Sequence, residues 1–157
     1  MSTAVDRIEH NLKKQIALLE TIYESDKRLT EESDATGIEG TRYDDYLDEQ
    51  NSYISKLEEL DEEYDELLSY LKEHKDEIDR ADSSRKSKVR SLIGELEGKL
   101  QAVNEAETKA RELVDRFISS RREELATSRR NVRVIQNNYR PLPSVTAADQ
   151  SIFDTTN

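Results

Sequence analysis

The stretch from Tyr46 to Leu71, "YLDEQNSYISKLEELDEEYDELLSYL", decides the fold. Its apolar residues recur at steps of three and four, which is the pattern of one face of an α-helix. Two positions of a seven-residue repeat carry most of this stripe: Tyr43, Gln50, Leu57, Tyr64, Leu71 and Ile78 at one, and Tyr46, Tyr53, Leu60, Leu67, His74 and Ala81 at the other. Leu47, Ile54 and Leu68 widen the stripe, so we expect a helix over 42–78 that packs between two neighbours. Carboxylates crowd its opposite face.

An earlier helix is predicted over 4–30. Thr3 and Asp6 have the spacing of a capping box at its start, and the glycine-containing segment 31–42 that follows it favours a loop. The apolar stripe of this helix consists of Val5, Ile8, Leu12, Ile16, Leu19, Ile22 and Tyr23.

A third helix is predicted over 83–139. Asp and Ser in "DRADSSRKSK" (79–88) favour caps over helix interiors, so we expect a turn before it, and Pro141 and Pro143 end it. Its stripe consists of Val89, Leu92, Ile93, Leu96, Leu100, Val103, Ala106, Ala110, Leu113, Val114, Phe117 and Ile118, and continues, rotated, through Leu125, Val132, Ile135 and Tyr139.

These patterns predict an all-α, antiparallel three-helix coiled-coil bundle over 1–140. The last helix would be roughly 80 Å long and the first about 40 Å at the rise of an α-helix, so the C-terminal third of the last helix should project without a partner in the chain. The polar residues 141–157 are predicted to form a disordered tail.

The composition favours long helices with narrow apolar stripes rather than a protein with a thick globular core. Among 157 residues, 38% are charged and 34% hydrophobic, which is typical of long helices. Without cysteine there are no disulfides and no thiol chemistry. No apolar run is long enough to span a membrane and no secretory signal is visible, so we expect a soluble cytoplasmic protein without membrane insertion.

Catalytic and metal-binding motifs are missing from the sequence. His10 and His74 are far apart, and solvated helix histidines explain both. The segment 34–45 lacks the glycine that an EF-hand needs at its sixth position, where Glu39 stands. We therefore expect no catalytic residues, no metal and no cofactor, with an enzyme as the last of the alternatives.

The charge of the chain is uneven, because a net charge of -11 coexists with seven arginines between Arg116 and Arg140. Such arginines could contact phosphates, but the pI of about 4.8 and the lack of a known motif argue against nucleic acid. They could also keep a long helix soluble or pair with the acidic helix.

A protein partner is the remaining interpretation of this segment. Phe117, Ile118, Leu125, Val132, Ile135 and Tyr139 form an apolar stripe, which Arg129 and Arg133 border. Arginine suits an interface rim, because its stem packs and its guanidinium pairs with carboxylates. An amphipathic helix of a client could dock there. A homo-oligomeric coiled-coil scaffold or adaptor, in which the stripe pairs with itself, is the alternative.

The layout resembles the flagellar export chaperones of the FlgN type, and more loosely their FliT-like relatives. The likeness is carried by the helical hairpin "IEHNLKKQIALLETIYE" and "YLDEQNSYISKLEELDEEYDELLSYL", by the long last helix, and by the short tail "SIFDTTN". The resemblance implies a cytoplasmic type III secretion chaperone for hook-associated flagellar proteins. The client-binding face that it implies comprises Leu113, Phe117, Ile118, Leu125, Val132, Ile135 and Tyr139.

Overall fold

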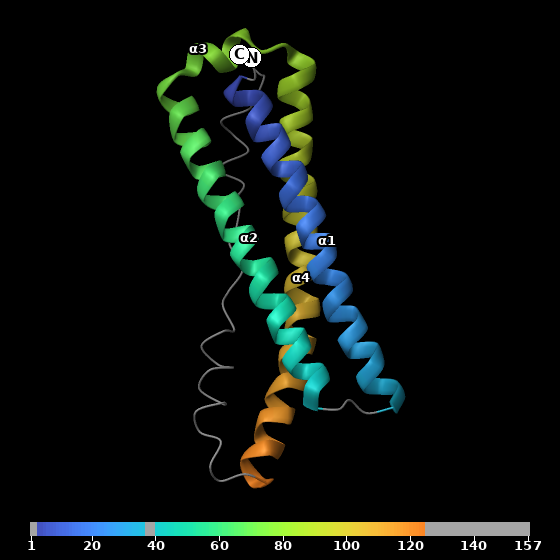
Figure 1. Cartoon of the computed structure of the whole chain (residues 1–157). Helices are drawn as coiled ribbons and strands as arrows, with labels where there is room; N and C mark the ends of the chain where they lie inside the picture. The colour runs from blue at the N-terminus through green and yellow to red at the C-terminus, as the bar shows by residue number, and fades with distance from the viewer. Residues whose placement is uncertain (1–2, 37–39, 125–157) are drawn as a thin grey trace.

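The computed structural model describes residues 3–36 and 40–124, and within these ranges every regular element is a helix. Three long helices, α1 (Ala4–Thr36), α2 (Gly40–Glu73) and α4 (Ser83–Glu124), lie side by side, and the short α3 (Lys75–Arg80) joins α2 to α4 (Figure 1). The predicted all-α class is confirmed. The predicted tail 141–157 and the last part of the helix predicted over 83–139 lie outside the described residues.

The start of α1 is fixed by its own side chains. The Asp6 amide donates to Thr3 Oγ1 and the Thr3 amide donates to Asp6 Oδ2, both at 3.1 Å. This reciprocal pair satisfies two N–H groups that have no partner inside the helix, so the predicted capping box is confirmed. The helix then runs on to Thr36, beyond the end expected near residue 30.

The helix predicted over 42–78 is interrupted. α2 ends at Glu73, and His74 adopts φ -124° and ψ 55°, outside the helical region. The Tyr70 carbonyl accepts from the His74 amide at 3.0 Å and lies 2.9 Å from the ring atom Nδ1. The heptad still places Ile78 in the core, where it is 6% exposed, so the chain bends at His74 without losing the phase of its stripe.

The turn expected within 79–88 lies at Ala81 and Asp82. Ala81 is extended, with ψ 141°, and the Arg85 amide donates to Asp82 Oδ1 at 2.7 Å. Asp82 thus caps α4, which is the role that Asp prefers at a helix start. The cap explains why the chain turns here without glycine or proline.

Ion pairs between α1 and α4 show that these two helices run parallel. Along α1 and α4, Asp6 pairs with Arg85, Glu9 with Lys88 at 3.2 Å, and Glu20 with Lys99 at 3.1 Å. The offset between the paired residue numbers is the same each time, as parallel helices in register require. α2 runs antiparallel to both (Figure 1).

The antiparallel pairing of α1 and α2 is set by polar groups as well as by apolar ones. Asn11 Nδ2 donates to the Leu60 carbonyl at 2.8 Å, and Gln15 Nε2 donates to Asn11 Oδ1 at 2.6 Å. Asn11 is buried, so sliding one helix along the other would leave its amide without the Leu60 carbonyl inside the core, whereas Gln15 holds Asn11 from within α1.

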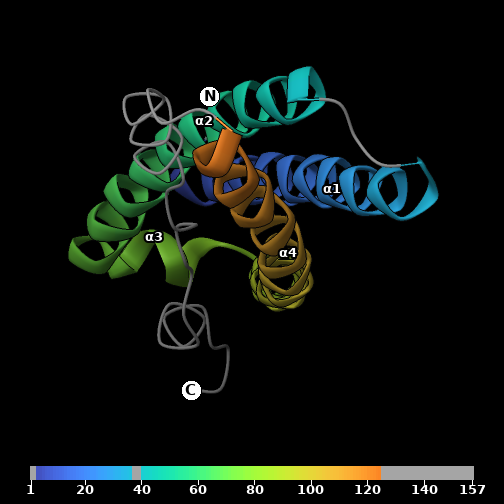
Figure 2. The same ribbon diagram turned by 90° about the horizontal axis from the view of Figure 1, so that it is seen from below.

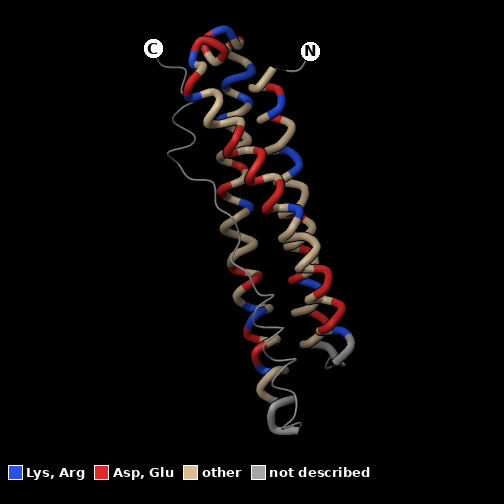
Figure 3. Tube along the Cα trace, turned by 60° about the vertical axis from the view of Figure 1, so that its left-hand side comes forward, with Lys and Arg blue, Asp and Glu red and all other residues tan. Residues whose placement is uncertain are grey.

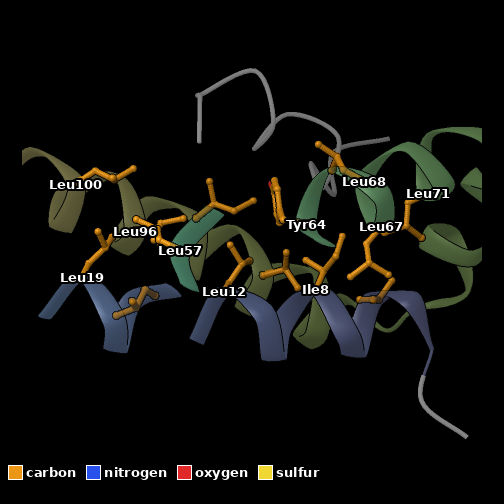
Figure 4. Close-up of a cluster of buried hydrophobic side chains, with 14 of the residues drawn as sticks. Ile8, Leu12, Leu19, Leu57, Tyr64, Leu67, Leu68, Leu71, Leu96 and Leu100 are labelled. Atoms are coloured by element: carbon orange, nitrogen blue, oxygen red, sulfur yellow. The ribbon is translucent and has the colours of Figure 1, made fainter. Parts of the chain in front are cut away.

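The larger apolar core, here called the upper cluster, occupies the half of the molecule next to α3. All three long helices contribute to it (Figure 4). Each fully buried leucine or isoleucine contributes about 1.5–3 kcal/mol relative to exposure, so this cluster dominates the stability of the fold. Its buried members are Val5, Ile8, Leu12, Ile16, Leu19, Ile22, Leu57, Tyr64, Leu67, Leu68, Leu71, Ile78, Val89, Ile93, Leu96, Leu100 and Val103.

Candidate partner-binding region

A second, smaller apolar core, here called the lower cluster, lies toward the other end of the molecule. Leu29 of α1, Tyr43 of α2 and Val114 of α4 are at most 8% exposed in it. The complete set of buried members is Leu29, Tyr43, Tyr46, Leu47, Ala110, Leu113, Val114 and Ile118, with Phe117 packed against them. The lower cluster therefore joins the end of α1, the start of α2 and the second half of α4.

Two contacts tie the ends of the helices together around this cluster. The rings of Tyr43 and Phe117 stack with their centroids 4.4 Å apart and an interplanar angle of 12°. Arg42 Nε donates to Glu32 Oε2 at 2.7 Å, which links the start of α2 to the last turns of α1. Aromatic pairs of this kind contribute about 0.5–1.5 kcal/mol beyond the area they bury.

α4 runs on beyond this cluster. Ile118 is buried in the cluster and Ser119 is exposed, and the helix continues to Glu124. Figure 1 shows the orange end of α4 passing the end of α1 and the start of α2. The backbone of α4 therefore extends past both of these helix ends.

Three of the side chains assigned to the client-binding face lie inside the molecule. Leu113 and Ile118 are 8% and 6% exposed, and Phe117 is half-buried against Tyr43. The expectation of an uncovered face is wrong for Leu113 and Ile118, because both belong to the lower cluster, to which α1 contributes Leu29 and α2 contributes Tyr43; Phe117 is partly covered by the same cluster. The other predicted members, Leu125, Arg129, Val132, Arg133, Ile135 and Tyr139, lie outside the described residues.

A polar layer separates the upper and lower clusters. Asp26 of α1 is fully buried, and its Oδ1 accepts from the Tyr46 hydroxyl and from Gln50 Nε2, the latter at 3.2 Å. The Glu107 carboxyl of α4 lies within hydrogen-bonding reach of Asp26. At the edge of the layer, Ser25 Oγ donates to Glu49 Oε2 at 3.1 Å. All three long helices thus place polar side chains at one level of the core.

The environment of Asp26 favours its neutral form. Burial removes water from the carboxyl, and the neighbouring Glu107 disfavours a second negative charge, whereas the Tyr46 hydroxyl acts in the opposite direction. Together these effects raise the pKa of Asp26 to about 9. The two neighbouring carboxyls therefore favour holding a proton between them at neutral pH.

Sequence reasoning missed this layer, although spacing carried a signal for it. Asp26 follows Ile22 by four residues and precedes Leu29 by three, so it stands in the apolar stripe of α1. Glu107 stands between Val103 and Ala110 in the same way. Periodicity can therefore show that each carboxylate stands at a core position of its own helix, but not that the two lie at the same level of the core.

Charged side chains elsewhere lie mainly on the outer faces. Figure 3 shows carboxylates recurring along the long helices among fewer basic residues. A surface groove of about 370 Å³ between α1 and α4 is lined by Glu20, Tyr23, Glu24, Lys99, Ala102 and Val103. Over the described ranges, no group of three or more His, Asp or Glu side chains could hold a metal ion.

Seen from the end of the molecule, the orange end of α4 projects in front of α1 and α2 (Figure 2). In the ranges 3–36 and 40–124, no helix is both long and apolar enough to cross a bilayer.

Comparison with protein-family models, with curated proteins and with solved structures found no match to this chain.

Proposed function

We propose that this protein is an export chaperone that binds a client polypeptide along the end of α4 and the residues that follow. The observation that carries the proposal is the passage of α4 beyond α1 and α2 (Figure 1). In the sequence, the apolar stripe continues past that point at helical spacing, through Leu125, Val132 and Ile135. Apolar side chains at such positions gain free energy when a second polypeptide covers them.

The border of this stripe favours an acidic or mixed-charge partner helix. Arg129 and Arg133 are one turn apart in a helical reading, and each can pack its stem over an apolar partner while its guanidinium binds a carboxylate. The described part of the chain supports this segment, because the lower cluster holds α4 immediately before the projecting end. An amphipathic helix laid along α4 would continue the three-helix packing of the body.

Hook-associated flagellar proteins are the clients that we propose, on the basis of the resemblance to flagellar export chaperones. The terminal helical segments of such proteins can supply the amphipathic helix that the stripe needs. The proposal places the protein in the cytoplasm as part of type III secretion. The scaffold alternative uses the same stripe for self-association.

Replacing Val132 and Ile135 by Asp tests the proposal. We expect the double variant V132D/I135D to keep its helicity and to lose at least tenfold in affinity for a purified hook-associated protein, measured by isothermal titration calorimetry. Two buried aliphatic side chains contribute several kcal/mol at about 25 cal/mol per Å², so a tenfold loss is a conservative expectation.

The matched control is N131D/N138D, which adds the same charge to the same segment but off the stripe. This control should bind as the unchanged chain does. Equal affinity of V132D/I135D and the control would refute the proposed binding face. Light scattering on the unchanged chain decides between client binding and the scaffold: a monomer that binds client supports the chaperone, and a stable oligomer that V132D/I135D dissociates supports the scaffold.

A further inference from the structure

The polar layer between the two clusters holds two carboxyl groups from different helices in the core. Asp26 Oδ1 already accepts two hydrogen bonds, from Tyr46 and Gln50. Asp26 Oδ2 is buried, and no N–H or hydroxyl group among the described residues donates to it. Because the Glu107 carboxyl lies within reach, a proton on one carboxyl can donate to the other and satisfy this buried oxygen.

We propose that Asp26, Tyr46, Gln50 and Glu107 form a proton-dependent latch, in which one proton shared by the two carboxyls holds the lower cluster closed and its loss lets this end of the molecule open as a unit. The geometry supports a unit boundary here, because the layer separates the upper from the lower cluster. Losing the proton would leave two negative charges side by side in a buried site, which is costly in a low dielectric.

The groups that contact Asp26 come from two neighbouring helices. From α2 they are the Tyr46 hydroxyl and the Gln50 amide, with Glu49 at the edge of the layer bound to Ser25. From α4 the facing group is the Glu107 carboxyl. α3 packs at the opposite end of the molecule (Figure 1). A proton on one of the two carboxyls removes the repulsion between them.

The direction of the pH effect follows from the protons bound in each state. The closed form keeps the Asp26 proton up to a pKa of about 9, whereas an open form releases it near the ordinary value of 3.8. Between these values the open form binds fewer protons, so raising the pH favours opening. One proton per molecule changes the opening equilibrium by up to about tenfold per pH unit.

Hydrogen exchange with the full chain tests the latch without any client. Protection factors are compared between pH 5.5 and pH 7.5 for the amides of the lower cluster and for those of the upper cluster. We expect the protection of the lower cluster to fall by up to about a hundredfold over this interval, while that of the upper cluster changes much less.

The variant Asp26→Asn isolates the proton. Its Oδ1 can accept from Tyr46 and Gln50, and its Nδ2 can donate to Glu107, so it mimics the protonated carboxyl without titrating. We expect a pH-independent and higher protection of the lower cluster at pH 7.5. Glu107→Gln should act in the same way from the other side, and Asp65→Asn, at an exposed position of α2, should keep the unchanged pH dependence.

Three results would overturn the latch. The two clusters could lose protection together, Asp26→Asn could keep the original pH dependence, or both amide variants could fail to fold, which would show that the carboxyls do not act as hydrogen-bonded neutral groups. A consequence for the client rests on the proposed function: opening would uncover Leu113 and Ile118. Because exchange is measured without client, its outcome is independent of the binding test.

Discussion

The upper and lower clusters are built from the same three helices but differ in what surrounds them. In the upper cluster, many leucine and isoleucine side chains pack together, and ion pairs such as Glu20–Lys99 lie beside them. The lower cluster is smaller, contains two tyrosines, and borders a layer of buried carboxyls. The difference indicates that the upper cluster carries most of the stability of the fold, and it is the lower cluster to which our two proposals assign a response to pH and to a partner.

The largest change in the free energy of unfolding is expected when a buried leucine is replaced by alanine in either cluster. Leu12 and Leu29 are both fully buried, in the upper and the lower cluster respectively. We expect Leu12→Ala to lower the free energy of unfolding by about 4 kcal/mol and Leu29→Ala by about 2 kcal/mol, within the usual range for such cavities. The smaller value follows because the lower cluster can relax toward the nearby end of the molecule.

Urea unfolding followed by circular dichroism measures both variants. If both variants lost the same free energy of unfolding, or if Leu29→Ala lost more, the lower cluster would not be the more loosely packed of the two. Leu18→Ala on α1 is the reference variant, because Leu18 is only partly buried beside the upper cluster. This substitution should lower the free energy of unfolding by less than Leu12→Ala does.

A smaller effect is expected at the aromatic pair of the lower cluster. Tyr43→Leu keeps an apolar side chain against Phe117 but removes the stacked ring. The free energy of unfolding should fall by about 1 kcal/mol, the usual contribution of such a pair beyond burial. Phe117→Leu should cost a similar amount, and the double variant should cost less than the sum; strict additivity of the two losses would contradict a direct stacking contribution.

The sequence was sufficient for the helical stripes but not for every boundary. Heptad positions of the stretch 42–78 such as Leu57, Tyr64 and Leu71 are buried as the repeat requires. The bend at His74 was not predictable from periodicity, because Ile78 keeps the phase on the far side of it. The predicted end of α1 was too early because its apolar stripe fades after Leu29, although the helix continues to Thr36.

The candidate site was only partly predictable for a related reason. The stripe of α4 is one pattern in the sequence, but tertiary contacts divide it: Leu113 and Ile118 are covered by α1 and α2, and the helix then passes their ends. The point along α4 at which α1 and α2 cease to cover it depends on the lengths of all three helices. The buried carboxyl pair needed the register between α1 and α4, which single-helix periodicity does not contain.

Hydrogen exchange along α4, with and without a saturating hook-associated client, tests the central claim most directly. The proposed binding mode predicts that amides from residue 119 to residue 139 gain protection on binding, while those from 89 to 103 in the upper cluster stay unchanged. Protection gained only on α1 or α2, with none beyond residue 118, would contradict a client-binding role for the end of α4.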